Sequence, residues 1–358
     1  MPDTVPAPVS HAADAQLEPL PPELTTIQPG GGFVMQLELA WGGVRRWWLK
    51  TCRGGYVRRM EALRKGARNP TPHGVLDPRD VKYYENQPGA YRWDSADDPF
   101  HWRDRLPFAR WGLAELVLMT GLGLALTAAF LFAAQLDDAP TALRYLLLVL
   151  ALGSAIATGL IVYFFRDPNR DIPRAPGQIV SPADGTVAAV TEYDHHPFIG
   201  GPAVKIGIFL SIFNVHVNRF PLTGKVVDVA YKRGKYLNAL KPESVLENEQ
   251  LHVKFITTDE ADGPPRKMVI HLIAGLIARR IVCVLKPGDA KRRGDRIGMI
   301  KLGSRTELVV PKEDGLRMLA RVGDKVHGGT TILAEYASAT EDADRHKPHP
   351  GPPPIPIS

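Results

Sequence analysis

The chain has 358 residues, of which 44% are hydrophobic and 23% charged, and both values are close to those of ordinary globular proteins. They exclude a collagen-like chain, a wholly disordered chain and a membrane protein of many spans, and the length favours two domains or one domain with appendages. The net charge of +6 is weak support for an anionic partner. Two cysteines, Cys52 and Cys283, are too few for a disulfide framework or a cysteine-rich metal site.

The N-terminal third divides into a tail and a basic segment. Residues 1–32 are rich in Pro, Ala and Asp and do not begin like a signal peptide, so we expect a disordered tail. In residues 33–110, Trp41, Trp47 and Trp48 are interleaved with arginines and lysines, which suits a segment lying on an anionic membrane surface. Nucleic-acid binding and a solvated basic helix are the alternatives. We favour the membrane surface and expect no nucleic-acid partner.

Two apolar runs without a charged residue follow, at 116–134 and 145–165. About 20 helical residues span roughly 30 Å, the thickness of a bilayer core, so residues 111–166 are predicted to form two transmembrane helices joined by a tight turn. The alternative is a buried hairpin of a soluble core. Arginines flank the pair on its outer ends, while the loop between the runs carries Asp137 and Asp138. The positive-inside rule then predicts that both termini lie in the cytoplasm.

Residues 167–336 show the period of two that is typical of strands. For example, Val204, Ile206, Ile208 and Leu210 alternate with other residues, and further short β-rich runs are separated by Gly, Pro and Asp. We therefore expect a mainly β catalytic domain. The Pro-rich tail at 337–358 is predicted to be disordered.

The β domain contains an internal repeat. The pattern Gly-Asp-x-x-x-x-Gly begins at Gly288 and again at Gly323, 35 residues later. Two such units resemble the quasi-symmetric halves of a biotinyl/lipoyl-type β sandwich, which is a statement about fold and not about chemistry. In a carrier of that type a lysine on an exposed hairpin takes biotin or lipoate, and Lys301 is the candidate here.

Five motifs occur in order along the second half of the chain: FFRDP (164–168), SPADG (181–185), FNVHVNR (213–219), AGLIARRIVC (274–283) and LGSR (302–305). With these motifs, residues 111–334 resemble the phosphatidylserine decarboxylase proenzymes, in particular their shorter bacterial and archaeal branch. The likeness covers about 60% of the chain and includes both apolar runs. No single motif is specific, but five at the family's spacing are strong together.

The resemblance implies that the chain makes its own cofactor. Ser304 would cut the Gly303–Ser304 bond and become a pyruvoyl group, leaving a β chain of residues 1–303 and an α chain of residues 304–358. The family's Asp, His and Ser fall on Asp184, His216 and Ser304, with the histidine, oriented by the aspartate, activating the serine hydroxyl. Glycine before the serine tolerates unusual backbone angles. In an extended chain His216 lies on the polar face of its segment. In isolation, Ser304 and Asp184 would read as turn residues.

The resemblance also implies the reaction. The pyruvoyl carbonyl would form a Schiff base with the amine of phosphatidylserine and take up the charge left by carbon dioxide, giving phosphatidylethanolamine. His216 could then protonate the α-carbon, and Arg219 is our candidate for binding the phosphodiester. No metal is expected. The rival base, His271, lies in an apolar strand, so we expect a structural role for it.

The chain departs from the larger branch of the family at two places. Arg305 follows the serine where that branch has threonine, and a second histidine before the motif's proline is missing, so the residue that takes over its role is open. Gln250 follows Glu249 where arginine is common, which affects only a local contact.

We therefore predict a membrane-bound decarboxylase on the cytoplasmic side of the inner membrane. The alternatives are a decarboxylase of a related serine-headed lipid, a membrane-tethered biotin/lipoyl carrier that uses Lys301, and an inactive lipid-binding relative. The resemblance leaves open whether the processed enzyme is a homodimer.

Overall fold

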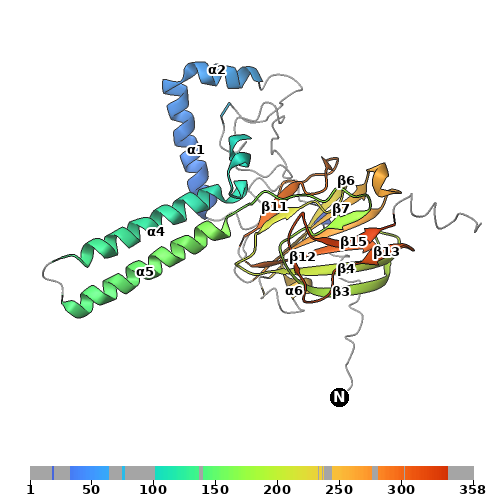
Figure 1. Cartoon of the computed structure of the whole chain (residues 1–358). Coiled ribbons are helices and arrows are strands. Elements are labelled where there is room, and N and C mark those ends of the chain that lie inside the picture. The colour runs from blue at the N-terminus through green and yellow to red at the C-terminus, as the bar shows by residue number, and fades with distance from the viewer. Residues whose placement is uncertain are drawn as a thin grey trace, which may run out of the picture.

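The computed structural model describes residues 18–19, 33–63, 75–76, 101–136, 140–232, 234–235, 237, 244–275, 281–301 and 303–337. This part of the chain forms an N-terminal helical arm, a long helical hairpin and a β domain (Figure 1). The helices are α1 (Phe33–Cys52), α2 (Gly54–Leu63), α4 (Leu113–Ala133), α5 (Thr141–Phe164) and α6 (Ser244–Glu247), with short 3-10 turns η2 (His101–Arg105), η3 (Arg110–Gly112) and η4 (Glu260–Asp262). The two predicted disordered tails lie outside the described residues, except for residue 337 and strand β1 (Glu18–Pro19).

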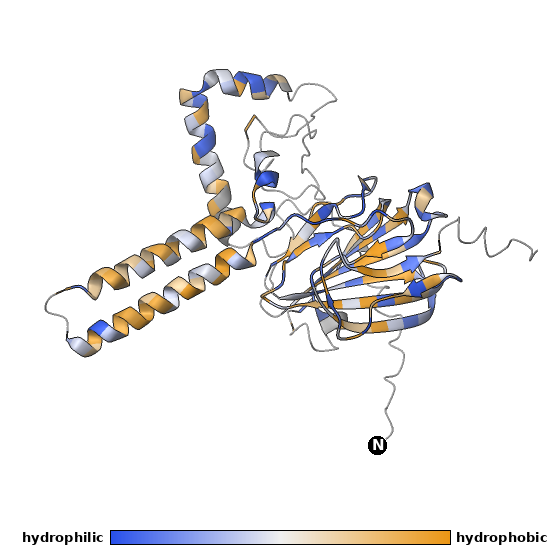
Figure 2. Ribbon diagram, in the orientation of Figure 1, coloured by the Kyte–Doolittle hydropathy of each residue, from blue (hydrophilic) through white to orange (hydrophobic). Residues whose placement is uncertain are grey.

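Helices α4 and α5 form the helical hairpin that the two apolar runs predict. Both are long and apolar enough to cross a membrane by length and composition. Most of their surface is apolar (Figure 2), and large side chains such as Leu122, Phe132 and Leu152 are exposed. This exposure argues against the alternative of a core hairpin in a soluble domain. Pro140 stands at the N-cap of α5, a place where its missing N–H and fixed φ are no disadvantage.

Small residues bring the two helices of the hairpin together. A Cβ atom on Gly123 of α4 would overlap the hydroxyl of Thr158 on α5. The Ser154 hydroxyl of α5 donates to the Gly123 carbonyl over 3.1 Å, and the Thr158 hydroxyl donates to the Ser154 carbonyl over 2.7 Å. Close approach of this kind is how apolar helices associate where surrounding lipid removes the hydrophobic driving force.

Replacing Gly123 with leucine should therefore destabilise the hairpin. We expect a loss of about 1–2 kcal/mol, which corresponds to a melting temperature lower by roughly 2–8 °C in detergent. Gly121 is the matched control, because no atom lies within 4 Å of a Cβ built on it. Equal shifts for Gly123→Leu and Gly121→Leu would show that the close contact contributes nothing.

The base of the hairpin is packed directly on the β domain. Eight buried side chains, which we call the junction cluster, join the two parts: Ala109, Leu116, Phe164, Phe165, Val215, Val217, Val282 and Met299. Backbone hydrogen bonds reinforce this contact, from Ala109 N to Phe165 O over 2.8 Å and from Asp167 N to Pro107 O over 2.9 Å. The end of α5 is thus fixed relative to the strands that follow it.

The strands fall into two halves of equivalent topology. The first half comprises β2 (Gln178–Val180), β3 (Gly185–His196), β4 (Gly201–Leu210), β12 (Ser304–Pro311), β13 (Leu316–Met318), β14 (Lys325–Val326) and β15 (Ile332–Tyr336). The second half comprises β5 (Val217–Arg219), β6 (Gly224–Lys232), β7 (Gln250–Thr257), β8 (Lys267–Ala274), β9 (Ile281–Cys283), β10 (Ala290–Lys291) and β11 (Arg296–Ile300).

The strand order makes this equivalence explicit. The nine-stranded sheet runs β1-β6-β7-β8-β12-β4-β3-β14, with β10 also paired to β6. The strands β8 and β12 form the central pair of this sheet. Outward from β8 lie β7, β6 and β10, and in the equivalent positions outward from β12 lie β4, β3 and β14. The two three-stranded sheets, β5-β11-β9 and β13-β15-β2, match in the same way. The halves exchange backbone hydrogen bonds, from Val180 N to Pro221 O over 3.0 Å and from Arg219 N to Pro182 O over 2.9 Å.

The Gly-Asp repeat forms the same turn in both halves. Gly288 and Gly323 adopt φ of 95° and 97°, a region that favours glycine. Each following aspartate accepts a hydrogen bond from the backbone N–H three residues before it, over 3.0 Å for Asp289 and 2.7 Å for Asp324. Each turn leads into a two-residue strand, β10 or β14. The repeat seen in the sequence thus corresponds to a repeat of local geometry.

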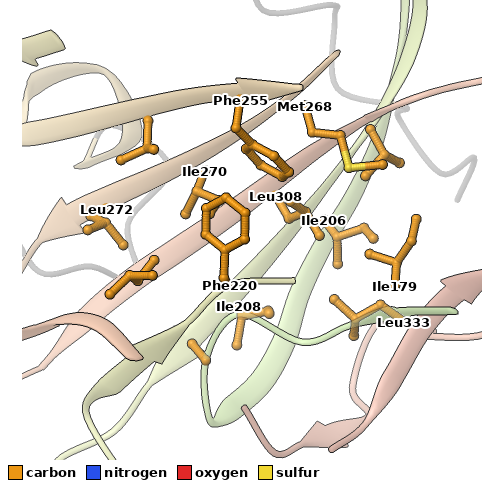
Figure 3. Close-up of a cluster of buried hydrophobic side chains, with 14 of the residues drawn as sticks. Ile179, Ile206, Ile208, Phe220, Phe255, Met268, Ile270, Leu272, Leu308 and Leu333 are labelled. Carbon is orange, nitrogen blue, oxygen red and sulfur yellow. The ribbon is translucent and has the colours of Figure 1, made fainter. Parts of the chain in front are cut away.

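The core of the β domain lies between the sheets (Figure 3). Phe220 and Phe255 pack with ring centroids 4.6 Å apart, surrounded by aliphatic side chains such as Ile206, Ile270 and Leu308. Burying each of these side chains stabilises the fold by about 1.5–3 kcal/mol. The predicted mainly β domain behind a pair of apolar helices is therefore confirmed.

Candidate active site

The predicted cleavage site lies at the start of the central strand β12. Ser304 pairs with Leu210 of β4 and with Ala274 of β8, and its side chain is fully buried. The Ser304 hydroxyl has no hydrogen-bond partner within the described part of the chain. A buried hydroxyl without a partner is unfavourable, and in native proteins it commonly marks a functional position.

Gly303, on the other side of the predicted scissile bond, has φ of 71°. No atom lies within 4 Å of a Cβ built on it, so it is the backbone conformation, and not a lack of space, that favours glycine here. The residue after Ser304 points to the opposite face of β12. There the Arg305 guanidinium donates to Glu307 over 2.8 Å, so the arginine at this position has a structural role.

His216 reaches the cleavage site from the segment before β5. Its Nε2 accepts a hydrogen bond from the Gly303 N–H over 3.2 Å, and its Nδ1 lies 2.9 Å from the Asn214 carbonyl oxygen. Because a carbonyl can only accept, Nδ1 carries the proton and Nε2 presents its lone pair to Gly303. The histidine ring packs on Phe164 at the end of α5, with ring centroids 4.5 Å apart. Asn218, two residues on, donates to Thr306 of β12 over 3.0 Å and holds the two segments together.

Burial keeps His216 neutral. Loss of water around the ring lowers its pKa from 6.5 to about 4, more than the hydrogen bond to Asn214 raises it. A neutral imidazole whose Nε2 carries no proton can act as a base across the whole physiological range once Nε2 exchanges the Gly303 N–H for the proton that it takes up.

The pH dependence of self-cleavage should report this shift. Protonation of Nε2 removes the base, so the rate falls as the pH drops through the pKa of His216. We expect a constant rate between about pH 5.5 and 8 and a loss only near pH 4, measured on precursor made by cell-free translation. A midpoint near 6.5 would mean that the titrating histidine is solvated.

Asp184 lies in a different set of contacts from the one predicted. Both of its carboxylate oxygens accept from the Arg170 guanidinium, over 3.0 and 2.8 Å, and Oδ1 also accepts from the Gly328 N–H over 2.7 Å. Nδ1 of His327 is 3.4 Å from Oδ2. Asp184 does not orient His216 as predicted, because the Asn214 carbonyl already holds Nδ1. Its charge acts on His216 only from a distance, raising the pKa of the imidazole slightly.

Arg219 is also engaged elsewhere. Its guanidinium donates to Asp167 over 2.8 Å, to the Gly294 carbonyl over 3.1 Å and to the Pro168 carbonyl over 3.3 Å. Arg296 donates to the same aspartate. These bonds link the segment after α5 to the β domain, and they do not favour the predicted role of Arg219 in binding phosphate.

The predicted carrier lysine is not exposed. Lys301 is buried and forms an ion pair with Glu115 in the first turn of α4. A biotin- or lipoate-bearing lysine must be accessible to its modifying enzyme, so this contact disfavours the carrier alternative.

His271 has the surroundings of a structural residue. Its ring stacks on His252 with centroids 3.7 Å apart, and its Nδ1 is 3.5 Å from the buried carboxylate of Glu307. Burial alone would raise the pKa of Glu307, but the hydrogen bond from His271 and the charges of Lys205 and Arg305 lower it to about 2. The cluster is therefore a buried ion network.

Sequence reasoning missed Arg170, His327 and Glu115. His327 lies in the second copy of the Gly-Asp repeat, where a histidine beside two glycines was the available signal. Asp184, the partner of Arg170, is 14 residues away along the chain, and Lys301, the partner of Glu115, is 186 residues away. A local sequence pattern does not predict contacts over such separations. Within the described residues, no group of three or more His, Cys, Asp or Glu side chains could hold a metal ion.

The chain is similar in sequence to known proteins. The family described as phosphatidylserine decarboxylase matches residues 157–334. A phosphatidylserine decarboxylase proenzyme of Rhodopirellula baltica is 46% identical over 258 residues, which cover 72% of this chain and 99% of that protein. Proenzymes of the same name from Desulfotalea psychrophila and Oleidesulfovibrio alaskensis are 43% and 47% identical, over 50% and 48% of this chain and 81% and 76% of their own lengths.

Proposed function

The chain belongs to the phosphatidylserine decarboxylase family, and we propose that it is a proenzyme that cuts its own Gly303–Ser304 bond. The cut converts Ser304 into a pyruvoyl group, with which the enzyme turns phosphatidylserine into phosphatidylethanolamine. One observation carries this proposal: the Ser304 hydroxyl is buried without a partner in the described chain, beside a left-handed Gly303 whose N–H meets Nε2 of His216.

Self-cleavage follows from these positions. The Ser304 hydroxyl attacks the Gly303 carbonyl carbon, and Nε2 of His216 takes the hydroxyl proton and passes it to the departing Ser304 nitrogen. The C–N bond breaks as the C–O bond forms, which leaves the two chains joined by an ester. In the elimination, a base removes the α-proton of residue 304 and the Gly303 carboxylate departs, which leaves dehydroalanine. Water then hydrolyses the imine tautomer of dehydroalanine to the pyruvoyl carbonyl and ammonia.

The residues around Ser304 suit a group that is formed in place. Ser304 Oγ is buried and lacks a partner within the described residues, so its departure with the Gly303 carboxylate breaks no hydrogen bond of the described chain. When formed, the pyruvoyl group supplies the carbonyl that binds the substrate amine and takes up the electrons left by carbon dioxide. His216 then holds the proton that is delivered to the α-carbon. No metal takes part in this scheme.

The two chains stay together after the cut. The α chain begins with β12, which lies between β4 and β8 at the centre of the large sheet, and it also supplies β13, β14 and β15. Strands β12, β14 and β15 each pair with a strand of the β chain, and β13 pairs with β15. Separation would break the nine-stranded sheet and the sheet β13-β15-β2. We also propose, on the repeated Gly-Asp turns, that the halves are of the biotinyl/lipoyl type.

We propose that Asp184 supports the site indirectly. Its bonds to Arg170 and to the Gly328 N–H join the segment after the hairpin to the loop that carries His327. Its negative charge favours the imidazolium that forms while His216 carries the proton.

The hairpin places this chemistry at the bilayer. We propose that α4 and α5 span the inner membrane, with both termini and the β domain on the cytoplasmic side, as the flanking Arg110 and Arg166 indicate. Phe164, the last residue of α5, contacts the ring of His216. A lipid head group in the cytoplasmic leaflet therefore lies close to the site.

Helix α1 fits the predicted membrane surface. It crosses the direction of the hairpin (Figure 1), and its Leu39 packs on the junction cluster at the base of α4. Trp41, Trp47 and Trp48 are exposed along it. Tryptophan and basic side chains are favoured at the level of lipid head groups. We propose that α1 lies on the cytoplasmic face of the bilayer.

An assay on lipid vesicles tests the proposed function. Purified enzyme should convert phosphatidylserine in vesicles to phosphatidylethanolamine with release of carbon dioxide, and borohydride, which reduces carbonyl groups, should abolish the activity. Activity that survives borohydride would exclude the pyruvoyl group. Turnover of another serine-headed lipid in preference to phosphatidylserine would favour the related substrate.

A further inference from the structure

A tight turn beside the site carries two apolar side chains at its tip. In the turn from Ser211 to Asn214, Ile212 and Phe213 are 43% and 56% exposed. The Asn214 side chain accepts from the Ser211 N–H over 2.9 Å and from its hydroxyl over 2.7 Å, and the Asn214 N–H donates to the Ser211 carbonyl over 2.9 Å. The two flanking residues thus close the turn and leave the tip to project.

The composition of this tip is unusual for a turn in water. Gly, Pro, Asn, Asp and Ser dominate turns, because they suit the backbone angles or hydrogen-bond to the chain. Adjacent exposed Ile and Phe contribute nothing to closing this turn, and they expose apolar surface that commonly marks an interaction site. An apolar surrounding is therefore expected for the tip.

The turn is fixed to the end of the hairpin. Arg166, two residues after α5, donates to the Phe213 carbonyl over 2.8 Å and to the Tyr163 carbonyl over 2.7 Å. Its guanidinium also lies over the Tyr163 ring, 3.6 Å from the centroid. The tip is thus held beside the cytoplasmic end of α5, where the hairpin would leave the bilayer. The positive charge of Arg166 at the end of the hairpin is attracted to the anionic lipids of the cytoplasmic leaflet.

The same turn is linked to the catalytic histidine. The Asn214 carbonyl that follows the tip accepts the hydrogen bond from Nδ1 of His216. One residue therefore closes the apolar tip and orients the base. Leu210, the residue before the turn, pairs with Ser304 across the sheet, so a lipid that meets the tip lies near the proposed cleavage site.

We propose that this turn inserts Ile212 and Phe213 into the cytoplasmic leaflet and forms the route by which the substrate's diacyl part approaches Ser304. The proposal rests on the proposed function, because it takes the hairpin as the membrane anchor. The partner is the acyl region of the bilayer. A peptide or a second copy of the chain on this tip is an outcome that the experiment below distinguishes.

Two substrates separate lipid access from chemistry. The double variant Ile212→Ser/Phe213→Ser should lose at least about tenfold in kcat/KM on long-chain phosphatidylserine in vesicles, equivalent to the burial of one apolar side chain. On a short-chain phosphatidylserine that is monomeric in solution, it should stay within about twofold of the unchanged enzyme. Val322→Ser is the control, because Val322 is 63% exposed on the turn before β14, and this turn is bonded to β3 through the Gly323 N–H and the Val187 carbonyl. Equal losses on both substrates would overturn the proposal.

A direct readout does not depend on activity. A spin label at Phe213→Cys, in a chain carrying Cys52→Ser, should become accessible to oxygen and shielded from a water-soluble nickel complex in anionic vesicles. A label at Val322→Cys should remain accessible to nickel. A label on the tip that stays in water would overturn the proposal, as would shielding from both nickel and oxygen, which would indicate a protein partner. If the unchanged enzyme turns over neither substrate, the proposed function fails, while the label still reports on the tip.

Discussion

A chain carrying Ser304→Ala is expected to remain a single polypeptide and to have no decarboxylase activity. Alanine removes the hydroxyl that attacks the Gly303 carbonyl, and no other residue can become the pyruvoyl group at that position. Because the hydroxyl is buried without a partner in the described chain, its removal should not destabilise the fold. Denaturing electrophoresis gives the chain count, and carbon dioxide release from labelled phosphatidylserine gives the activity.

The control for this variant is Thr257→Ala. Thr257 is also buried, but its hydroxyl accepts from the Arg266 N–H over 2.8 Å at the far end of β7. Its loss should reduce stability by about 1 kcal/mol and leave the cut complete. If Ser304→Ala is stable and uncut while Thr257→Ala is less stable and fully cut, the missing cut in Ser304→Ala is due to the lost hydroxyl and not to misfolding. If Ser304→Ala is cut or still decarboxylates lipid, the pyruvoyl mechanism is wrong.

Replacing His216 with alanine should slow self-cleavage by about 10²–10⁴-fold, the usual contribution of a positioned base. The precursor should accumulate and should be visible by pulse-chase. Nε2 of His216 is the neutral basic atom that the structure brings to Gly303. A small loss would mean that another group, or water, takes the serine proton.

The matched control here is His271→Gln. His271 is the rival base and is likewise buried, yet it contacts Glu307 and stacks on His252. Glutamine keeps a donor for the carboxylate, so processing should continue at the unchanged rate. A slow cut in His271→Gln together with a normal cut in His216→Ala would reverse the assignment of the base.

The fold could be predicted where the pattern is local. The apolar runs of the hairpin and the alternation in β4 each lie within one element, and each was read correctly from spacing alone. The turns at Gly288 and Gly323 could be predicted from the Gly-Asp repeat, because each copy of the repeat is also a short local pattern. The pairing of β8 with β12, which joins the two halves, could not be predicted, because no local pattern encodes a contact between distant segments.

The roles of the site residues stay predictions. The resemblance carried by the motifs places the cleavage site at Gly303–Ser304 and the base at His216, and the structure brings Gly303 and His216 into contact. The structure does not show Asp184 orienting the imidazole, because the Asn214 carbonyl holds Nδ1 of His216. Arg219 illustrates a second limit, since a sequence shows a cation but not the buried carboxylate, here Asp167, that neutralises it.

The intact mass of the enzyme under denaturing conditions shows whether residue 304 has become a pyruvoyl group. We expect two chains, a β chain that ends with the Gly303 carboxylate and an α chain that begins at residue 304 and is lighter by one ammonia than a chain beginning with serine. Sequencing from the amino end of the α chain should be blocked, because a pyruvoyl group has no amine. A single intact chain in an active preparation, or an α chain with a free serine at its start, would exclude the pyruvoyl mechanism.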